Sequence, residues 1–186
     1  MKARIFVRTF SLLLLLGLIT SLKIEAHQRD KDRWNKKYDS ENYLFGKHPI
    51  KFLNDNIHFL PKGRALDIAI GEGRNGVYLA TQGFEVVGVD ISEKGLKKAQ
   101  RLAKENNVTI KTRVVDLETI QLEKNAYYVI ICSYYMQRDM FKQMKDALKP
   151  GGMVLVETYN ADYLKYNSHF KPEWALGENE LLDVFK

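Results

Sequence analysis

The sequence is poor in the residues that form disulfides and metal centres. Its 186 residues include one cysteine, Cys132, and four histidines that lie far apart, His27, His48, His58 and His169. A single cysteine excludes an intramolecular disulfide and a cysteine-rich zinc site, and the scattered histidines match no metal-ligand motif. We therefore predict no metal site, and we expect Cys132 to be a small apolar residue at the buried end of a strand.

Excess charge is missing from most of the chain. The formal net charge is +6, but residues 1–37 alone carry nine Lys or Arg and three acidic residues. The rest of the chain carries 20 basic and 20 acidic residues and is neutral. Because a nucleic-acid-binding domain needs a basic face on the folded domain itself, we predict no nucleic-acid partner.

Long apolar runs are missing as well. The stretch from Phe10 to Leu22 has 13 residues, whereas a membrane-spanning helix needs about 20. A basic start, a short apolar stretch and polar sequence afterwards are typical of a signal peptide. Residues 1–26 are therefore predicted to be a signal peptide or a membrane anchor, with membrane association through residues 5–22, and residues 27–186 to be the folded domain. The domain is then membrane-associated or exported, and a cytoplasmic location is the alternative.

The folded part alternates short apolar segments with amphipathic ones. Strands are expected over residues 64–70, 84–90, 108–116, 126–132 and 152–159, with helices over 74–83, 92–107 and 137–148 between them. This alternation predicts an α/β fold: a doubly wound, mainly parallel sheet with helices on both faces. Such sheets bind ligands beyond the carboxyl ends of their strands, where the strand order reverses.

A glycine-rich loop follows the first expected strand. Residues 66–80, "LDIAIGEGRNGVYLA", contain Gly71-x-Gly73-x-x-Gly76, a spacing that suits any nucleoside cofactor. Asp67 lies just before this loop, where a carboxylate is unfavourable beside a dinucleotide pyrophosphate and favourable beside a cationic cofactor; Glu72, inside the loop, indicates the same.

Two further acids lie at the ends of the next two strands. Asp90 is placed to accept both ribose hydroxyls, and Asp116 can accept from an adenine amino group. Three acids at successive strand ends favour S-adenosyl-L-methionine over NAD as the cofactor.

Three motifs together resemble the class I S-adenosylmethionine-dependent methyltransferases. They are "LDIAIGEGRNGVYLA", "FEVVGVDIS" and "LKPGGMVLVET", and with "WNKKYDSENYLFGKHP" upstream the chain is similar to the small-molecule branch that includes tellurite-resistance and thiopurine-type enzymes. The likeness covers roughly residues 33–186. It implies a Rossmann-like methyltransferase fold, S-adenosyl-L-methionine as cofactor and a small-molecule methyl acceptor.

The resemblance also implies which residues form the site. The implied cofactor-binding residues are Asp67, Gly71 and Gly73 around the methionine part, Asp90 and Ile91 at the ribose and adenine, Asp116 and Leu117 at the adenine edge, Ser133 near the methionine part or the acceptor, and Ile68 and Asn75 without a more specific role. The candidates for the acceptor pocket are Tyr43, Ser133, Tyr134 and Tyr135. Methyl transfer from a sulfonium to an acceptor that is already nucleophilic needs no obligate acid or base, so no catalytic residue is assigned. Trp34 and Tyr38 are expected to pack a helix on the sheet.

One departure from the family is expected. The family sheet normally has seven strands, whereas this sequence ends in the helix expected over residues 177–185, so the sheet is predicted to lack its last two strands. Two other functions stay open from the sequence: an NAD-dependent oxidoreductase, and a non-catalytic binding module with the cofactor fold, anchored at the membrane.

Overall fold

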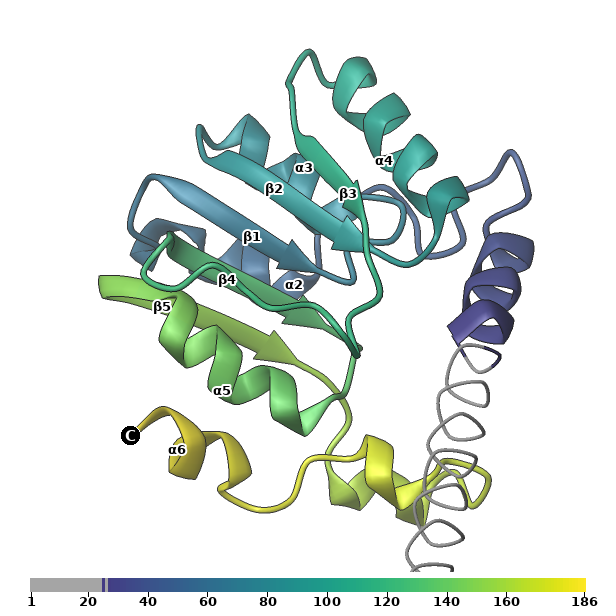
Figure 1. Cartoon of the computed structure of the whole chain (residues 1–186), viewed down its shortest axis with the longest axis vertical. Coiled ribbons are helices and arrows are strands. Elements are labelled where there is room, and N and C mark those ends of the chain that lie inside the picture. Colours follow the sequence, from purple (N-terminus) through teal and green to yellow (C-terminus); the bar gives the residue numbers. More distant parts are fainter. Residues whose placement is uncertain (1–24, 26) are drawn as a thin grey trace, which may run out of the picture.

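A five-stranded parallel sheet organises the part of the chain that the structure describes. A computed structural model describes residue 25 and residues 27–186. The strand order is β3-β2-β1-β4-β5, and every neighbouring pair is parallel (Figure 1). The strands are β1 (Arg64–Ile68), β2 (Glu85–Asp90), β3 (Lys111–Val114), β4 (Tyr127–Ser133) and β5 (Leu148–Glu157).

Helices cover both faces of the sheet. Buried residues of α2 (Lys51–Asn56), α3 (Arg74–Thr81) and α4 (Glu93–Glu105) pack on one face, and those of α5 (Arg138–Ala147) pack on the other face together with α6 (Glu180–Phe185). Short 3-10 helices are η1 (Ile57–Phe59), η2 (Ala161–Lys165) and η3 (Pro172–Trp174). The predicted doubly wound α/β fold is confirmed.

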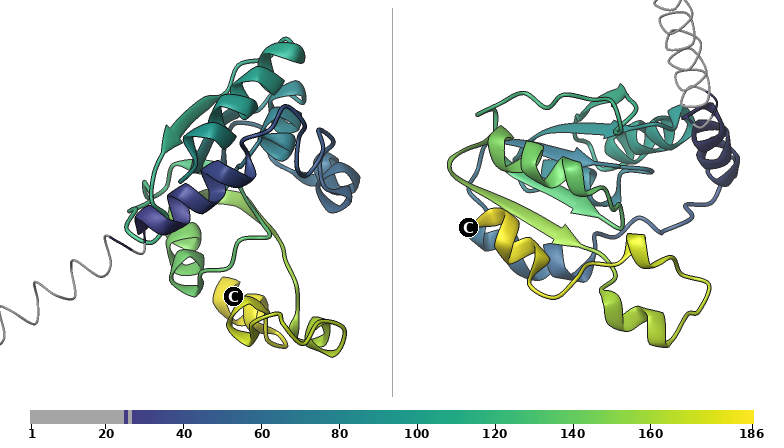
Figure 2. Two further views of the ribbon diagram at one scale, coloured as in Figure 1. Left: turned by 90° about the vertical axis from the view of Figure 1, so that its right-hand side faces the viewer. Right: turned by 60° about the horizontal axis from the view of Figure 1, so that its bottom comes forward.

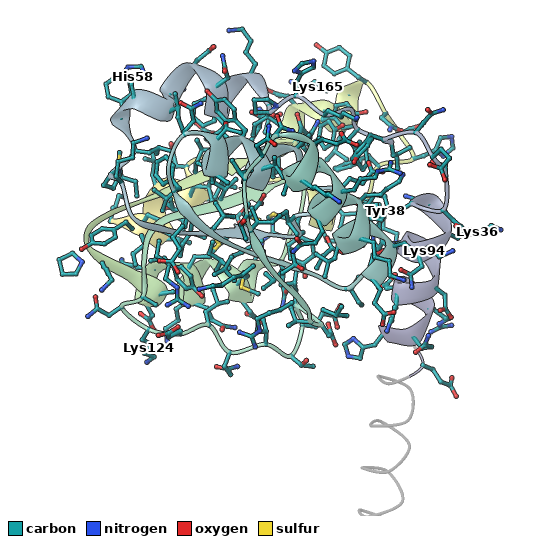
Figure 3. The ribbon with its side chains drawn as sticks, turned by 90° about the horizontal axis from the view of Figure 1, so that it is seen from above. Lys36, Tyr38, His58, Lys94, Lys124 and Lys165 are labelled. Carbon is teal, nitrogen blue, oxygen red and sulfur yellow. The ribbon has the colours of Figure 1, made fainter. Side chains whose placement is uncertain are left out.

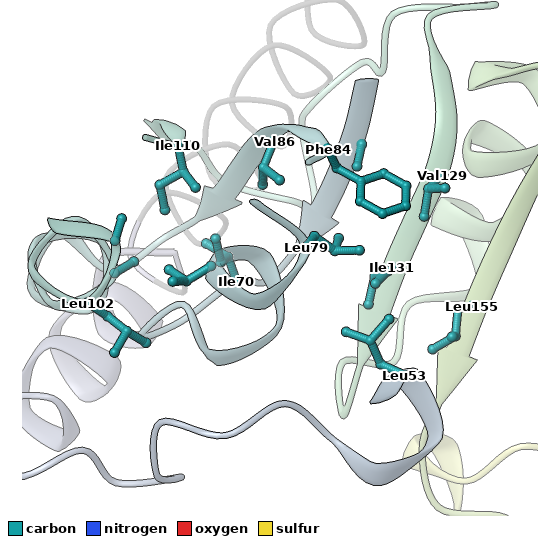
Figure 4. Packing of buried hydrophobic residues seen from close by; sticks show 14 of the residues in the cluster. Leu53, Ile70, Leu79, Phe84, Val86, Leu102, Ile110, Val129, Ile131 and Leu155 are labelled. Carbon is teal, nitrogen blue, oxygen red and sulfur yellow. The ribbon is translucent and has the colours of Figure 1, made fainter. Parts of the chain in front are cut away.

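The core on the first face shows why the sheet is stable. Leu53 of α2 and Leu79 of α3 are fully buried against Val129, Ile131 and other apolar side chains of the strands (Figure 4). Removing such side chains from water contributes roughly 2 kcal/mol each. Cys132 is buried in the core of the opposite face, as expected, and burial raises the pKa of its thiol to about 12.

The carboxyl ends of the strands lie on one side of the sheet, where the candidate site is formed. The strand order reverses between β1 and β4, and both strands end at the side toward which the arrowheads of Figure 1 point. A helix over residues 27–37 and the segment after β5 flank this side (Figures 1 and 2). The segment over residues 158–176 loops away from the sheet before the chain returns to α6 (Figure 2). The switch point of the sheet is thus bordered by segments from both halves of the chain.

The end of the sheet at β5 differs in detail from the prediction. β5 begins at Leu148, so the glycine turn after α5 is part of the strand, and the pairing with β4 shifts register between Tyr127 and Val129. Gly151, with φ +75°, provides the left-handed residue of this bulge. Among the described residues β5 is the last strand at this edge of the sheet. This agrees with the five strands expected from the sequence. A groove of about 370 Å³ lies beside β5 between α2 and α6.

The N-terminal predictions fall outside the described residues. Residues 1–24 and residue 26 contain the apolar stretch on which the signal peptide or membrane anchor was predicted. In the part of the chain that is described, no helix combines the length and the apolar character needed to cross a bilayer.

Two glycines with positive φ offer a matched test of packing at the glycine loop. A Cβ at Gly73 (φ +94°) would lie 2.7 Å from Cβ and 2.8 Å from Cα of Ala99 in α4, whereas a Cβ at Gly83 (φ +84°) would meet nothing within 4 Å. We expect Gly83→Ala to lower the free energy of unfolding by about 1 kcal/mol through backbone strain. Gly73→Ala is expected to cost at least about 2 kcal/mol more, because α3 and α4 must separate. Urea unfolding of the two variants measures this, and equal losses would contradict it.

Candidate functional site

The carboxyl group of Asp67 is buried at the end of β1 without a full set of partners. Its residue is 1% exposed, and Oδ2 has no hydrogen-bond partner among the described residues. Burial raises its pKa to about 8, a rise that the backbone amide of Gly76 and the charge of Arg74 oppose. The third glycine of the loop makes room for it, since a Cβ at Gly76 would lie 3.0 Å from Oδ2. An unpartnered buried carboxyl oxygen is costly and marks a place for a donor or a cation.

The carboxylate of Asp90 holds the glycine loop against the start of α4. Its Oδ2 accepts from the Gly71 amide at 2.8 Å, and its Oδ1 accepts from the Ser92 amide at 2.8 Å. Burial raises the pKa of Asp90, and these amide donors oppose the rise. The side chain of Ser92 in turn caps α4 by accepting from the Gly95 amide. Asp90 therefore fixes the shape of the loop, a role that the sequence interpretation did not include.

Glu72 has a different role from the one expected. Its Oε1 forms a buried ion pair with Lys98 Nζ at 2.6 Å, and its Oε2 accepts from the Phe45 amide at 3.3 Å. Lys98 also donates to the Asn42 carbonyl at 2.6 Å. Because its charge is neutralised inside the protein, Glu72 is no evidence for a cationic cofactor. It ties the glycine loop to the segment over residues 42–45.

The helix over residues 27–37 lies across the ends of β2 and β3. His27 Nδ1 pairs with Asp116 Oδ2, the carboxyl group expected at the adenine edge. Asn35 Oδ1 accepts from the Ser92 hydroxyl at 2.7 Å and from the Lys94 amide at 3.2 Å, so the helix is joined to the start of α4. The Glu118 amide donates to Asp116 Oδ1 at 2.9 Å. In this structure Asp116 already has partners on both oxygens.

Tyr38 is a site residue that sequence reasoning missed. It follows the 27–37 helix and is buried, facing the body of the protein while Lys36 points away (Figure 3). A Cβ on Gly71 would lie 2.8 Å from its hydroxyl, and its ring packs on Gly95. Burial, with the charges of Asp90 and Glu72, raises its pKa well above the usual range. Tyr38 was expected to pack a helix on the sheet. In the structure it packs on the glycine loop and on the first turn of α4.

Asn75 and Ser133 connect two loops at the switch point. Asn75 Nδ2 donates to Ser133 Oγ at 2.9 Å, and its Oδ1 accepts from the Ile50 amide at 3.0 Å. These bonds place Ser133, at the end of β4, beside the first turn of α3. The structure thus brings together two residues that the resemblance implied for cofactor binding.

The tyrosines expected in the acceptor pocket are separated. Tyr134 donates to Glu157 Oε1 at 2.7 Å, and this bond is the main reason that its pKa rises to about 12. Tyr135 donates to Gln137 Oε1 at 2.5 Å and packs in the core under α5. Tyr43 contacts a different element in the described structure: its hydroxyl donates to the Lys98 carbonyl of α4 at 3.1 Å, and its place in an acceptor pocket stays a prediction.

Apolar residues complete the site. Ile68 and Leu117 are buried, and Ile91 is half-buried after Asp90. The arrangement has a buried acid beside a glycine loop, a second acid at the next strand end, and an apolar residue directly after each strand-end acid. It suits a ligand with a cationic group, adjacent hydroxyls and a flat apolar part.

Comparison with known proteins agrees with this geometry. Residues 65–152 match a family model described as a methyltransferase domain. These residues form a methyltransferase domain. The match runs from β1 to the bulge of β5 and includes the glycine loop and Asp90.

The chain is also similar to curated methyltransferases and to solved structures of the same fold. The chain is 31% identical over 140 residues to the ubiquinone biosynthesis O-methyltransferase of Rickettsia akari, covering 68% of this chain and 55% of that protein. It is 24% identical to the probable S-adenosyl-L-methionine-dependent methyltransferase TehB of Haemophilus influenzae, over 85% of this chain and 55% of the relative. The phosphoethanolamine N-methyltransferase 2 of Haemonchus contortus, solved in complex with S-adenosyl-L-methionine, has the same fold, with a TM-score of 0.58, 23% identity and coverage of 82% and 39% of the two chains. The chain spans about half the length of the curated relatives it matches.

The raised pKa of Asp67 predicts how stability depends on pH. The unfolded chain ionises this carboxyl near its ordinary value of 3.8, whereas the folded protein keeps the proton to about 8. A group whose folded pKa is raised destabilises the fold as pH rises between the two values, by up to about 1.4 kcal/mol per pH unit. Asp67→Asn removes this dependence and is therefore expected to be more stable than the wild type at pH 8. Urea unfolding at pH 5, 6.5 and 8 measures it, and parallel pH profiles for the two proteins would contradict it.

Proposed function

We propose that this chain transfers a methyl group from S-adenosyl-L-methionine to a small-molecule acceptor. The observation that carries the proposal is the unpartnered buried oxygen of Asp67 beside the glycine loop. The cofactor supplies a methyl group on a positively charged sulfur and carries an ammonium group. An ammonium donor satisfies the carboxylate and returns it to its ionised form, so the residues present fit this cofactor.

Asp90 supports the same cofactor at the next strand. Each of its oxygens accepts one amide hydrogen bond, and a carboxylate offers about four acceptor positions. Two adjacent hydroxyls can therefore bind without releasing the glycine loop. Ile91 and Leu117 provide apolar surface beyond it for a flat base.

The chain contributes position and charge to the transfer rather than a proton acceptor. Asp67 and Asp90 would hold the bound cofactor so that its methyl group could be presented to the nucleophilic atom of an acceptor, and position would supply most of the rate. Tyr134, with a pKa of about 12, keeps its proton near neutral pH and is no general base. Ser133 is held by Asn75 at the end of β4, close to the reacting groups in this proposal. An acceptor that is already nucleophilic fits this arrangement.

The other functions considered have less support. A dinucleotide would place a pyrophosphate at the loop that follows Asp67, where the buried acid disfavours it, and the relatives named above are methyltransferases. A non-catalytic module would show no turnover, so a turnover assay distinguishes it from an enzyme that also binds the cofactor. Membrane association or export through residues 1–26 stays a prediction from their sequence, with a cytoplasmic location as the alternative.

Cofactor binding tests the proposal directly. We expect the full chain to bind S-adenosylhomocysteine, and not NADH, in a calorimetric titration. Asp67→Asn is expected to weaken this binding by at least about ten-fold, because it removes a charge-assisted hydrogen bond. Asp146→Asn, the same change on an exposed residue of α5, is the matched control and should bind as the wild type does.

Three other outcomes of the titration would contradict the proposal or part of it. Binding of NADH alone would favour the oxidoreductase. A folded protein that binds neither ligand would overturn the proposal and favour the binding module. Equal binding by the wild type and Asp67→Asn would leave the cofactor in place and remove Asp67 from the site.

The contact between His27 and Asp116 predicts a competing interaction. His27 pairs with the Asp116 carboxyl group that the resemblance assigns to the adenine amino group, so an adenine has to compete with it for this carboxyl. His27→Ala is therefore expected to tighten S-adenosylhomocysteine binding by up to about five-fold, since a partly exposed ion pair near the surface is worth about 1 kcal/mol or less. His58→Ala, on η1, is the control. Weaker binding by His27→Ala would mean that the 27–37 helix contributes to the cofactor site instead of competing for it.

A further inference from the structure

The guanidinium of Arg74 is held in place without a carboxylate partner. It is half-buried in the first turn of α3, and Cζ lies 5.7 Å from the ring centre of Phe45 and 5.9 Å from that of Tyr134. Its Nη1 donates to the Phe45 carbonyl at 3.2 Å. Within residues 27–186 it forms no ion pair with an acid. A guanidinium has five N–H donors in a fixed plane, so most of them remain for a ligand.

The acidic side chains near Arg74 have other partners. Glu72 is paired with Lys98, and Glu157 accepts from the Tyr134 hydroxyl. Asp67 is buried and its Oδ2 has no hydrogen-bond partner in the described part of the chain, so it does not pair with Arg74. A positive charge thus remains at the start of α3, where the helix dipole adds to it.

A row of aromatic rings extends from this charge over the end of β5. The aromatic row consists of Tyr134, Tyr159, Tyr163, Phe170 and Trp174, whose successive rings lie 4.1–5.8 Å apart. Tyr134 and Trp174, at its two ends, are 50% and 42% exposed. A contiguous exposed aromatic surface on a folded domain is typical of a binding site.

Tyr134 is fixed where the row meets Arg74. It has φ +55°, a left-handed conformation that is unfavourable for a bulky residue. Its amide donates to the Glu157 carbonyl at 2.8 Å, and its hydroxyl donates to the carboxylate of the same residue. Backbone strain of this kind is retained at functional sites.

We propose that the methyl acceptor carries an anionic group, which Arg74 binds, and a flat apolar body that lies along the aromatic row. The inference rests on the proposed function and names the class of its substrate. An unpaired guanidinium binds a carboxylate or another oxyanion through parallel hydrogen bonds and repels a cationic acceptor. Arg74 follows Gly73 directly, so the bound anion would lie next to the glycine loop, where the methyl donor is proposed to bind.

Three probes of equal shape and different charge test the proposal. They are 4-methylbenzoate, 4-methylbenzamide and 4-methylbenzamidinium, titrated into the full chain saturated with S-adenosylhomocysteine and followed by NMR. The anion is expected to bind at least about five-fold more tightly than the neutral amide, and the cation least tightly. Arg74→Gln should lower the affinity for the anion to that for the amide and leave the amide unchanged.

Two further variants complete the design. Arg113→Gln makes the same change on an exposed residue of β3, at the opposite edge of the sheet, and should keep the preference for the anion. Tyr159→Leu should weaken the binding of the anion and of the amide by a similar factor, because Tyr159 is the ring of the row that lies next to Tyr134. Thermal unfolding followed by circular dichroism shows whether each variant is folded.

Several results would overturn the inference. They are equal affinity for the three probes, no binding of any probe at millimolar concentration, and an Arg74→Gln variant that loses affinity for the anion and for the amide equally. A loss of S-adenosylhomocysteine binding in Arg74→Gln would also overturn it, since the guanidinium would then serve the cofactor. A wild-type protein that fails to bind S-adenosylhomocysteine overturns the proposed function instead, so the two failures are distinguishable.

Discussion

The site depends on carboxyl groups that are buried at the ends of parallel strands. Asp67 is surrounded by the apolar residues that make β1 a central strand, and the same burial that stabilises the sheet raises the pKa of this acid. The free protein therefore holds an unsatisfied polar group inside its buried core. A ligand that brings a positive charge relieves this cost, so stability of the empty protein and affinity for the ligand are opposed at one residue.

Asp90 shows how one side chain serves the fold and the site together. It accepts amides from the glycine loop and from the start of α4, which fixes the distance between these two elements. The ion pair of Glu72 with Lys98 adds a connection to the segment that precedes α2. The loop is thus held in its binding shape by the protein's own hydrogen bonds, and little ordering remains to be done when a ligand arrives.

The sequence predicted well what depends on local pattern. The strand and helix alternation and the burial of Cys132 follow from residue spacing and apolar character, and the structure confirms them. It predicted poorly what depends on side chains from distant segments. Nothing local to Glu72 indicates that Lys98 neutralises it, and nothing local to Tyr43 indicates that its hydroxyl bonds to α4. Tyr38 was missed for the same reason, since its contact with Gly71 exists only after the 27–37 helix crosses the strand ends.

Charge is divided between the two halves of the site. The acids Asp67 and Asp90 lie at the ends of β1 and β2, on the side that the 27–37 helix covers, whereas Arg74 faces Tyr134 and the segment after β5. A methyl donor with a positive sulfur is attracted to the first half, and an anionic acceptor is attracted to the second. Opposite charges on donor and acceptor would draw the two substrates together, and the transfer would remove the positive charge on the donor's sulfur, a change that a dry site favours. The asymmetry of the fold around its switch point would then be what orients the two substrates toward each other.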